Sequence, residues 1–180
     1  MMDGTKDKLY VRVEDAKVIF NTFINCQYAL LVGLTHSEHP HGTVPRGCVI
    51  ANNLFFSGTP GMKHQTYTAG LQIVKLVEND KPEDWKWFGN IAHGELGIPV
   101  IEGIHMKNPA LCFLKNGVAV PEVEMQSERD PSINLEIVNV DLLGTRRGTK
   151  KTAGAVEYPV NPRGRGPLTA CQVGPQAESL

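Results

Sequence analysis

The residues with the clearest chemical potential lie between positions 39 and 75, where a strand pattern leads into Ser-Gly-Thr-Pro-Gly-Met-Lys at residues 57–63. Thr59 is a favourable helix N-cap and Pro60 a favourable first helical residue, so the amides after them would point outward without intrahelical partners. Four side chains add a guanidinium, two hydroxyls and an ammonium: Arg46, Ser57, Thr59 and Lys63. A terminal phosphate needs such donors, so the pattern predicts an anion site. A plain turn before a capped helix is the structural alternative.

A second group of candidate ligands consists of three imidazoles within six residues: His36, His39 and His41. Neighbouring imidazoles can bind zinc, copper or iron, and a catalytic metal site needs three ligands and an open position. Pro40 constrains the same stretch, and loops between strands are commonly hydrophilic, so a solvent-facing polar turn is the alternative. A metal protein built on this histidine cluster stays open as a further hypothesis.

Composition limits the class of protein before any element is placed. The chain has 180 residues, 41% hydrophobic content and a formal net charge of -1, which indicates one domain with an ordinary core and argues against nucleic acid or an anionic membrane as its main partner. The first eight residues are polar, and no apolar run approaches the roughly eighteen residues of a membrane span. The four cysteines form no Cys-x-x-Cys pair. These features predict a cytoplasmic protein with reduced thiols.

One helix and a set of strands should position these groups. Apolar residues recur at three- and four-residue spacing over residues 14–26, which predicts an amphipathic helix. Residues 28–35 are apolar on both faces and predict a buried strand. Further strands are predicted over residues 43–51, 54–58 and 71–78, with a short helix between the last two. Connections this short favour antiparallel neighbours.

Later segments continue the β pattern. Residues 85–91 alternate as in a fifth strand, and Asn116-Gly117 lies between apolar runs at residues 110–115 and 118–120, which is a strong hairpin signature. Over residues 133–142 the apolar parity switches, which a bulge or burial on both faces would explain. The chain is therefore predicted to be mostly antiparallel β.

After Gly144 the composition changes to basic residues interspersed with Gly, Pro and Thr: Arg146, Arg147, Lys150, Lys151, Arg163 and Arg165. We interpret residues 10–143 as the folded domain and residues 144–180 as a basic, loosely packed arm. Such an arm could clasp the second subunit of a dimer or bind an acidic surface such as RNA. A solvated tail is the alternative, because Tyr158 is the only aromatic residue that could stack on bases there.

The order of these elements resembles the FMN-binding split β-barrel family, which includes the pyridoxamine 5'-phosphate oxidase-like proteins. The resemblance covers about residues 14–91 and rests on short motifs. The family's Pro-rich turn with a later Pro is met by Pro40-His41 and Pro45, and its apolar strand ending in a hydroxyl residue is met by residues 54–57. Its Lys before a short helix and an apolar strand is met by Lys63 and residues 66–77.

The resemblance implies a mainly β fold with flanking helices (α+β), an antiparallel split β-barrel that forms a homodimer around FMN. By position, Arg46, Ser57, Thr59 and Lys63 would contact the phosphate or ribityl chain, and Val44, Pro45 and Cys48 would lie near the flavin ring. The implied function is an FMN-dependent oxidoreductase that transfers hydride between the flavin and a small organic substrate. His93 and His105 are the candidate proton donors beside the ring.

Two other functions remain open beside this one. A non-enzymatic protein on the same fold could hold flavin, haem or another anion without turnover. A RidA-like imine deaminase is the other, based on Asn-Leu-Phe-Phe-Ser-Gly at residues 53–58 and Asn-Leu-Glu-Ile at residues 134–137. That fold requires two long helices, and little long amphipathic periodicity occurs between residues 58 and 133.

Overall fold

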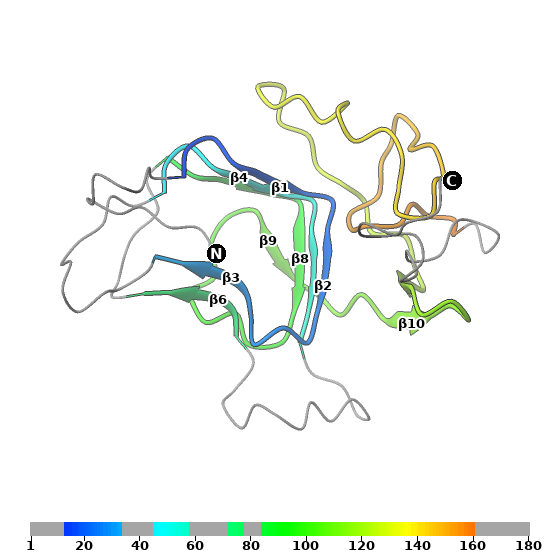
Figure 1. Ribbon diagram of the computed structural model, residues 1–180, viewed down its shortest axis with the longest axis horizontal. Helices are drawn as coiled ribbons and strands as arrows, with labels where there is room; N and C mark the ends of the chain where they lie inside the picture. The colour runs from blue at the N-terminus through cyan, green and yellow to red at the C-terminus, as the bar shows by residue number, and fades with distance from the viewer. Residues whose placement is uncertain (1–12, 34–44, 58–71, 78–83, 161–180) are drawn as a thin grey trace, which may run out of the picture.

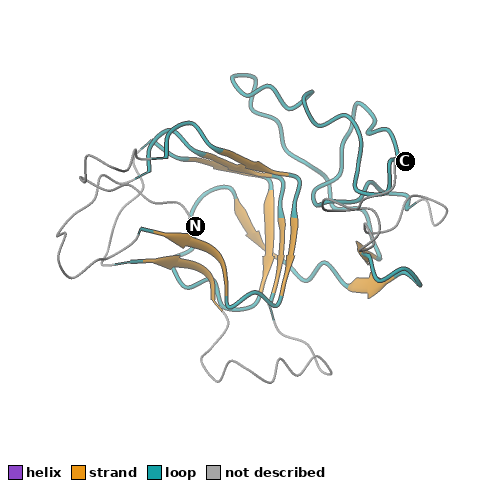
Figure 2. Cartoon of the chain, in the orientation of Figure 1, coloured by secondary structure: helices purple, strands orange, loops and turns teal. Residues whose placement is uncertain are grey.

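The computed structural model describes residues 13–33, 45–57, 72–77 and 84–160 of the chain. Within these ranges the regular structure consists of short β-strands and includes no helix (Figure 2). The described residues therefore contain no helix that could cross a membrane. The strands near the N-terminus stack on one another as successive turns of a coil (Figure 1).

Three parallel sheets form this coil. The first contains β1 (Lys17–Ile19), β4 (Val49–Ala51) and β7 (Lys86–Phe88). The second contains β2 (Thr22–Ile24), β5 (Leu54–Phe56), β8 (Asn90–His93) and β9 (Ile104–Met106). The third contains β3 (Tyr28–Val32) and β6 (Gln72–Leu76). Because the chain visits the sheets in turn and then adds a rung to each, the topology is that of a parallel β-solenoid.

Each coil bends at the same place, just ahead of its strand in the second sheet. Phe20, Asn52, Gly89 and Gly103 precede the second-sheet strands in register, and their φ angles are 55°, 54°, 61° and 86°. This left-handed conformation is unfavourable for most side chains. At Gly103 a Cβ atom would also overlap the backbone carbonyl of Trp87. Glycine is therefore required where the neighbouring coil comes this close.

An asparagine follows the corner residue in each of the first three coils. Asn21 donates its backbone N–H and its Nδ2 to Oδ1 of Asn53 (2.9 and 3.2 Å), and Asn53 donates the same two groups to Oδ1 of Asn90 (3.2 and 3.0 Å). The Nδ2 groups of Asn53 and Asn90 also donate to the carbonyls of Val18 (2.8 Å) and Ile50 (2.7 Å). This asparagine ladder gives the backbone N–H groups of Asn21 and Asn53 an acceptor at the bend.

The interior of the solenoid is filled by side chains that point inward from the stacked strands. Ile50, Phe55 and Val74 are at most 1% exposed, and the cluster is completed by Leu30, Ile73, Ala92, Leu96 and Ile104. The ring of Phe23 stacks on that of Phe55, with centroids 5.1 Å apart and planes 11° from parallel. Equivalent positions of successive coils thus bury apolar surface against one another.

After β9 the chain leaves the coil and returns along its outside. β10 (Leu111–Phe113) and β11 (Ala119–Pro121) form an antiparallel hairpin. Residues 122–160, which we name the C-terminal cover, follow it and lie beside the second sheet in Figure 1. Two apolar contacts join the cover to the solenoid: Met125 and Ala153 pack with Leu54 and Ile91, and Leu135 packs with Val49, Ala51 and Phe88.

The cover is held by buried charged groups. Arg147 donates from Nη1 to Oε2 of Glu157 (2.8 Å) and from Nη2 to the carbonyl of Gly154 (2.7 Å), and its guanidinium lies 4.7 Å from the ring centroid of Phe20. Burial lowers the pKa of Arg147, and the carboxylates of Glu157 and Asp141 oppose that effect. These bonds join residues 7 and 10 positions apart, so they hold this part of the cover in a defined conformation without regular strands.

The predicted antiparallel split β-barrel with flanking helices is wrong, because the three solenoid sheets are parallel and the described residues contain no helix. Residues 14–26, predicted as a helix, form β1, a corner and β2. The apolar residues of this stretch divide between two sides of the coil wall, because Phe23 packs against the solenoid core whereas Ile19 and Phe20 pack in the outer cluster that includes Leu135. The single strand predicted over residues 85–91 is also wrong, because Gly89 divides it into β7 and β8.

Other element predictions are confirmed. The strands predicted at residues 28–35, 54–58 and 71–78 correspond to β3, β5 and β6, and the Asn116-Gly117 hairpin is formed by β10 and β11.

Two other segments differ from their predictions. The strand predicted over residues 43–51 begins only at Val49, and residues 133–142 contain turns and a single bridge residue instead of a strand. The helix predicted after Thr59 lies outside the described residues.

Candidate functional site

A polar groove lies where the C-terminal cover meets the outside of the second sheet. Its volume is about 570 Å³, and it is open to solvent. The floor is formed by Ile91 of β8 and His105 of β9, which are partners in register. We name it the lateral groove, and it is lined by Ile91, His105, Lys107, Glu124, Met125, Gln126, Ser127 and Glu128.

Strand alternation decides which side chains of β9 reach this groove. Ile104 is 5% exposed and belongs to the solenoid core, so His105 points outward and Lys107, two residues later, lies on the same side. The Lys107 backbone N–H donates to the carbonyl of Ala92 (2.9 Å), which continues the pairing with β8 beyond the end of β9. An imidazole and an ammonium therefore share the outer face of the last rung.

Glu128 anchors the groove, because its groups contact three successive coils. Its backbone N–H donates to Oδ1 of Asn52 (2.8 Å), and its carbonyl accepts from Nδ2 of the same asparagine (3.0 Å). Its Oε2 accepts the backbone N–H of Gly89 (2.9 Å), and its Oε1 lies 2.5 Å from Nε2 of His105. The corner thus fixes the carboxylate, and the carboxylate orients the imidazole ring.

This arrangement can perform proton transfer. With Nε2 of His105 held by Glu128, Nδ1 is the ring nitrogen left for a ligand among the described contacts. The side chains of His105 and Glu128 are 56% and 46% exposed, so a ligand in the groove can reach the pair. Imidazole held by a carboxylate is the usual construction of a general acid or base. The described residues contain no group of three metal-ligating side chains.

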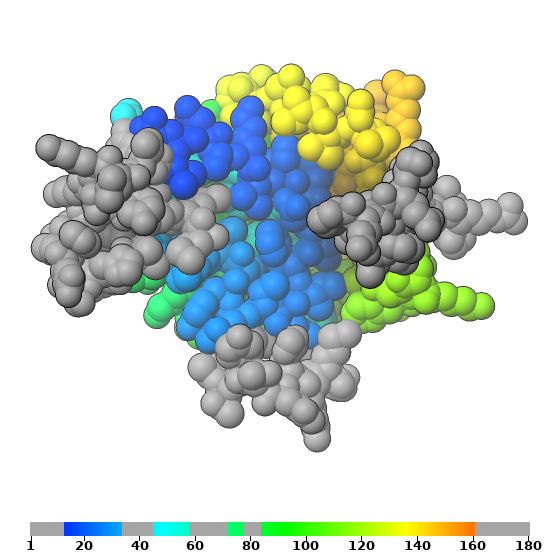
Figure 3. Space-filling view, in the orientation of Figure 1, coloured from blue at the N-terminus to red at the C-terminus, as the bar shows by residue number. Residues whose placement is uncertain are grey.

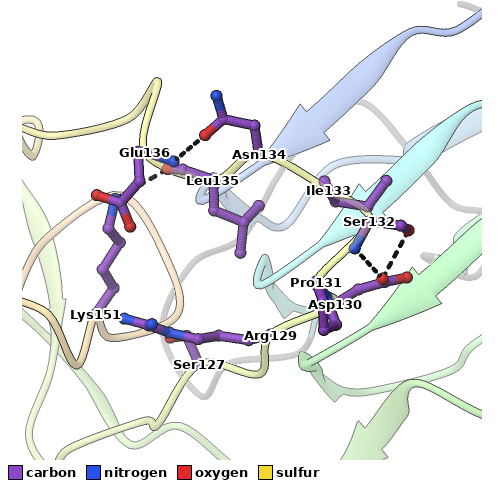
Figure 4. A pocket seen from close by; sticks show the side chains of 10 residues that line it. All are labelled: Ser127, Arg129, Asp130, Pro131, Ser132, Ile133, Asn134, Leu135, Glu136 and Lys151. Atoms are coloured by element: carbon purple, nitrogen blue, oxygen red, sulfur yellow. Dashed lines mark hydrogen bonds and ion pairs between the residues drawn. The ribbon is translucent and has the colours of Figure 1, made fainter.

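A second open depression, of about 540 Å³, shares Ser127 with the lateral groove (Figure 4). Oδ1 of Asp130 accepts the N–H (2.8 Å) and the O–H (2.7 Å) of Ser132, and these bonds hold the pKa of Asp130 below its usual range. The side chain of Lys151 reaches toward Glu136 in Figure 4, and its Nζ donates to two backbone carbonyls, at 2.9 and 2.8 Å. Because its buried cation is already paired, this depression is part of the scaffold of the cover.

The residues predicted for the anion site occupy different environments. Arg46 is exposed before β4 and pairs with Asp84, with 3.5 Å between Nε and Oδ2, whereas Ser57 is buried after β5. Pro45 accepts a hydrogen bond from the Trp85 indole, and Cys48 is buried, which raises the pKa of its thiol. The other predicted residues lie outside the described residues: Thr59 and Lys63 of the anion site, Val44 near the predicted flavin ring, and His36, His39 and His41 of the metal hypothesis.

The two histidines named as proton donors are both described. His93 stacks on the ring of Phe56, with centroids 5.1 Å apart, and His105 lies in the lateral groove. No local sequence pattern marks Glu128 as a site residue, because its partner Asn52 is 76 residues away. The asparagine ladder did have a signal: Asn followed by a β-type triplet recurs as Asn-Thr-Phe-Ile, Asn-Leu-Phe-Phe and Asn-Ile-Ala-His from residues 21, 53 and 90.

Comparisons with known proteins give little similarity. No protein-family model matches this chain, and no curated protein matches it. Among solved structures, one match is a PL6 family alginate lyase, with a TM-score of 0.47 and 16% sequence identity. The match covers 63% of this chain and 14% of that chain, so it involves a small part of the lyase. The solenoid assignment rests on the strand pairing of the present chain.

The predicted FMN-dependent oxidoreductase is therefore wrong as a functional assignment. It depended on an antiparallel split barrel with flanking helices, whereas the solenoid sheets are parallel and the described residues contain no helix. The parallel topology also excludes the alternative of a non-enzymatic flavin-binding protein, because that alternative assumed the same split-barrel fold. FMN itself, a homodimer, a small-molecule substrate and a cytoplasmic location stay predictions, because no described contact tests them.

Proposed function

We propose that the lateral groove binds a carbohydrate chain and that His105 transfers a proton there. The observation that carries this proposal is the pair formed by His105 and Glu128 in an open polar groove. A general acid or base must be oriented and must reach its ligand. The half-exposed imidazole meets both requirements, since Glu128 is itself held by Asn52 and Gly89.

The mixed polarity of the groove favours a hydroxyl-rich ligand. Lys107 and Gln126 supply hydrogen-bond donors, and Glu124 supplies acceptors. Hydroxyl groups both donate and accept hydrogen bonds, so they can bind to both kinds of side chain. Nucleic acid would require an excess of cations. An apolar small molecule would require an enclosed apolar pocket, whereas this groove is open. The stacked rungs of a solenoid also offer a long continuous face, which suits an extended polymer.

A panel of neutral and acidic oligosaccharides tests the proposal, with alginate included because it is named in the matched structure. Calorimetric titration measures binding, and mass spectrometry of the products measures cleavage. His105→Gln should lower turnover about a hundredfold or more, as expected for loss of a general acid or base, and should change binding much less. Lys107→Ala should weaken binding.

Glu122→Gln is the matched control, because Glu122 is an exposed carboxylate of the same cover that does not line the groove. It should leave binding and cleavage unchanged. Cleavage that survives His105→Gln would remove the proton-transfer role. If no member of the panel binds, the carbohydrate assignment itself fails.

A further inference from the structure

The asparagine ladder has a direction, and within the described part of the chain its first member, Asn21, donates to the ladder but accepts nothing from it. Each asparagine donates two hydrogen bonds to Oδ1 of the asparagine in the next coil, from Asn21 to Asn53 and from Asn53 to Asn90. Oδ1 of Asn53 and Oδ1 of Asn90 therefore each accept two bonds. No described donor contacts Oδ1 of Asn21, which is the position where a preceding coil would place its own asparagine amide.

The strand edges at this end of the solenoid are also unpaired among the described residues. β1 pairs with β4 and β2 pairs with β5, each on one side. Alternate residues make these bonds, as shown by Val49 N–H to Ala16 (2.8 Å) and Leu54 N–H to Asn21 (2.8 Å). In a parallel ladder, the backbone N–H and C=O groups of the intervening residues point away from the paired strand. The amides directed away from the second coil are those of Lys17, Ile19, Thr22 and Ile24.

The apolar interior reaches the same surface. Val18 and Phe23 are half-buried, although their counterparts in the second coil, Ile50 and Phe55, are 0% and 1% exposed. Figure 3 shows residues of the first coil on the face toward the viewer. We name residues 17–24 the first-coil face, and it combines directed strand edges, part of the apolar core and the open end of the ladder.

We propose that the first-coil face binds a further parallel β-solenoid coil that carries an asparagine in register with Asn21. Such a coil would donate its backbone N–H and Nδ2 to Oδ1 of Asn21 and would cover Val18 and Phe23. A second copy of this chain does not supply these groups, because its last rung has Ile104 in the ladder position, paired with Asn90. Two first-coil faces placed together would oppose one acceptor with another.

A fused coil tests this proposal in the full chain. A copy of residues 45–57, which contains β4, the ladder asparagine and β5, is joined ahead of Met1, so that twelve residues separate the copy from residue 13. Twelve extended residues span up to about 40 Å, which is longer than the roughly 26 Å of the eight-residue face. The matched control carries alanine in the copy at the position that corresponds to Asn53. Hydrogen exchange of the amides in residues 17–24 is the measurement.

The fusion with asparagine should slow exchange in residues 17–24 about tenfold or more relative to the unfused chain, because the exposed edge amides become paired. The alanine fusion should give much less protection. Exchange in residues 54–56, which are paired in all three chains, serves as the folding control. Equal exchange of the first-coil face in all three chains, or equal protection by both fusions, overturns the proposal. An unfused dimer with protected residues 17–24 would assign the face to a second copy and also overturn it.

Discussion

Replacing Asn53 by alanine tests whether the asparagine ladder holds the coils together. Asn53 is completely buried. Its side chain donates to the carbonyl of Val18 (2.8 Å) and to Oδ1 of Asn90 (3.0 Å), and its Oδ1 accepts the backbone and side-chain N–H groups of Asn21 (2.9 and 3.2 Å). Alanine removes these four hydrogen bonds and leaves the Val18 carbonyl and the Asn21 N–H without these partners.

The expected cost follows from these contacts. Each intramolecular hydrogen bond contributes about 1 kcal/mol net, and a buried group left unpaired costs about 1–3 kcal/mol. We expect Asn53→Ala to lower the free energy of unfolding by about 4 kcal/mol. Asn21→Ala is the matched control and should cost about 1 kcal/mol or less, because water can replace contacts at the exposed end of the ladder. That difference corresponds to about 10 °C between the two melting temperatures.

Urea unfolding followed by circular dichroism measures both variants against the wild-type chain. The midpoints and slopes give the free energies by linear extrapolation. Equal costs for Asn53→Ala and Asn21→Ala would refute the reasoning, since buried ladder amides would then contribute no more than exposed ones.

Three further predictions concern single sites. Gly103→Ala should destabilise the chain by about 3 kcal/mol or more, because φ is 86° and the new Cβ would overlap the neighbouring coil. Gly117→Ala is the control, since φ is 82° there but the space is open, and it should cost less in the same urea assay. A larger cost for Gly117→Ala than for Gly103→Ala would contradict this prediction. Cys48 is buried with a raised thiol pKa, so iodoacetamide should modify it only in urea, whereas exposed Cys26 should react in the native chain; peptide mapping that finds Cys48 itself rapidly labelled in the native chain would count against its burial. Ser132→Ala should raise the pKa of Asp130 toward its ordinary value, since Ser132 supplies the main hydrogen bonds that lower this pKa. The stabilisation from the ionised carboxylate is lost as pH falls through the folded pKa, so in the variant it should be lost at a higher pH. An unchanged NMR titration of Asp130 would disprove the assigned cause.

Local patterns were sufficient for individual strands and for one turn. β3, β5 and β6 are short apolar runs between polar stretches, and such runs favour buried strands in any sheet. The hairpin at Asn116-Gly117 has a three-residue loop between Leu114 and Val118, and its glycine has a positive φ of 82°. His105 was also selected as a chemically useful residue, although for a flavin site that the chain does not form.

Local patterns were misleading wherever a corner or a distant pairing set the structure. The spacing over residues 14–26 is helical only when the bend at Phe20 is ignored. Short connections suggested antiparallel neighbours, yet the strands pair with rungs 32 and 37 residues away along the ladder. The unequal coil lengths hid the repeat, because inserted residues change the period while the register of the sheets is maintained.

The amino-acid sequence by itself determined the strand-forming segments, the hairpin and the recurring asparagines, because these depend on the conformational preferences of neighbouring residues. Only the tertiary structure decided that the strands stack in parallel and that His105 meets Glu128. The physical reason is that parallel pairing and the anchoring of Glu128 by Asn52 join groups far apart along the chain, 76 residues in the latter case. Such contacts arise from register and burial across coils, which no local pattern encodes.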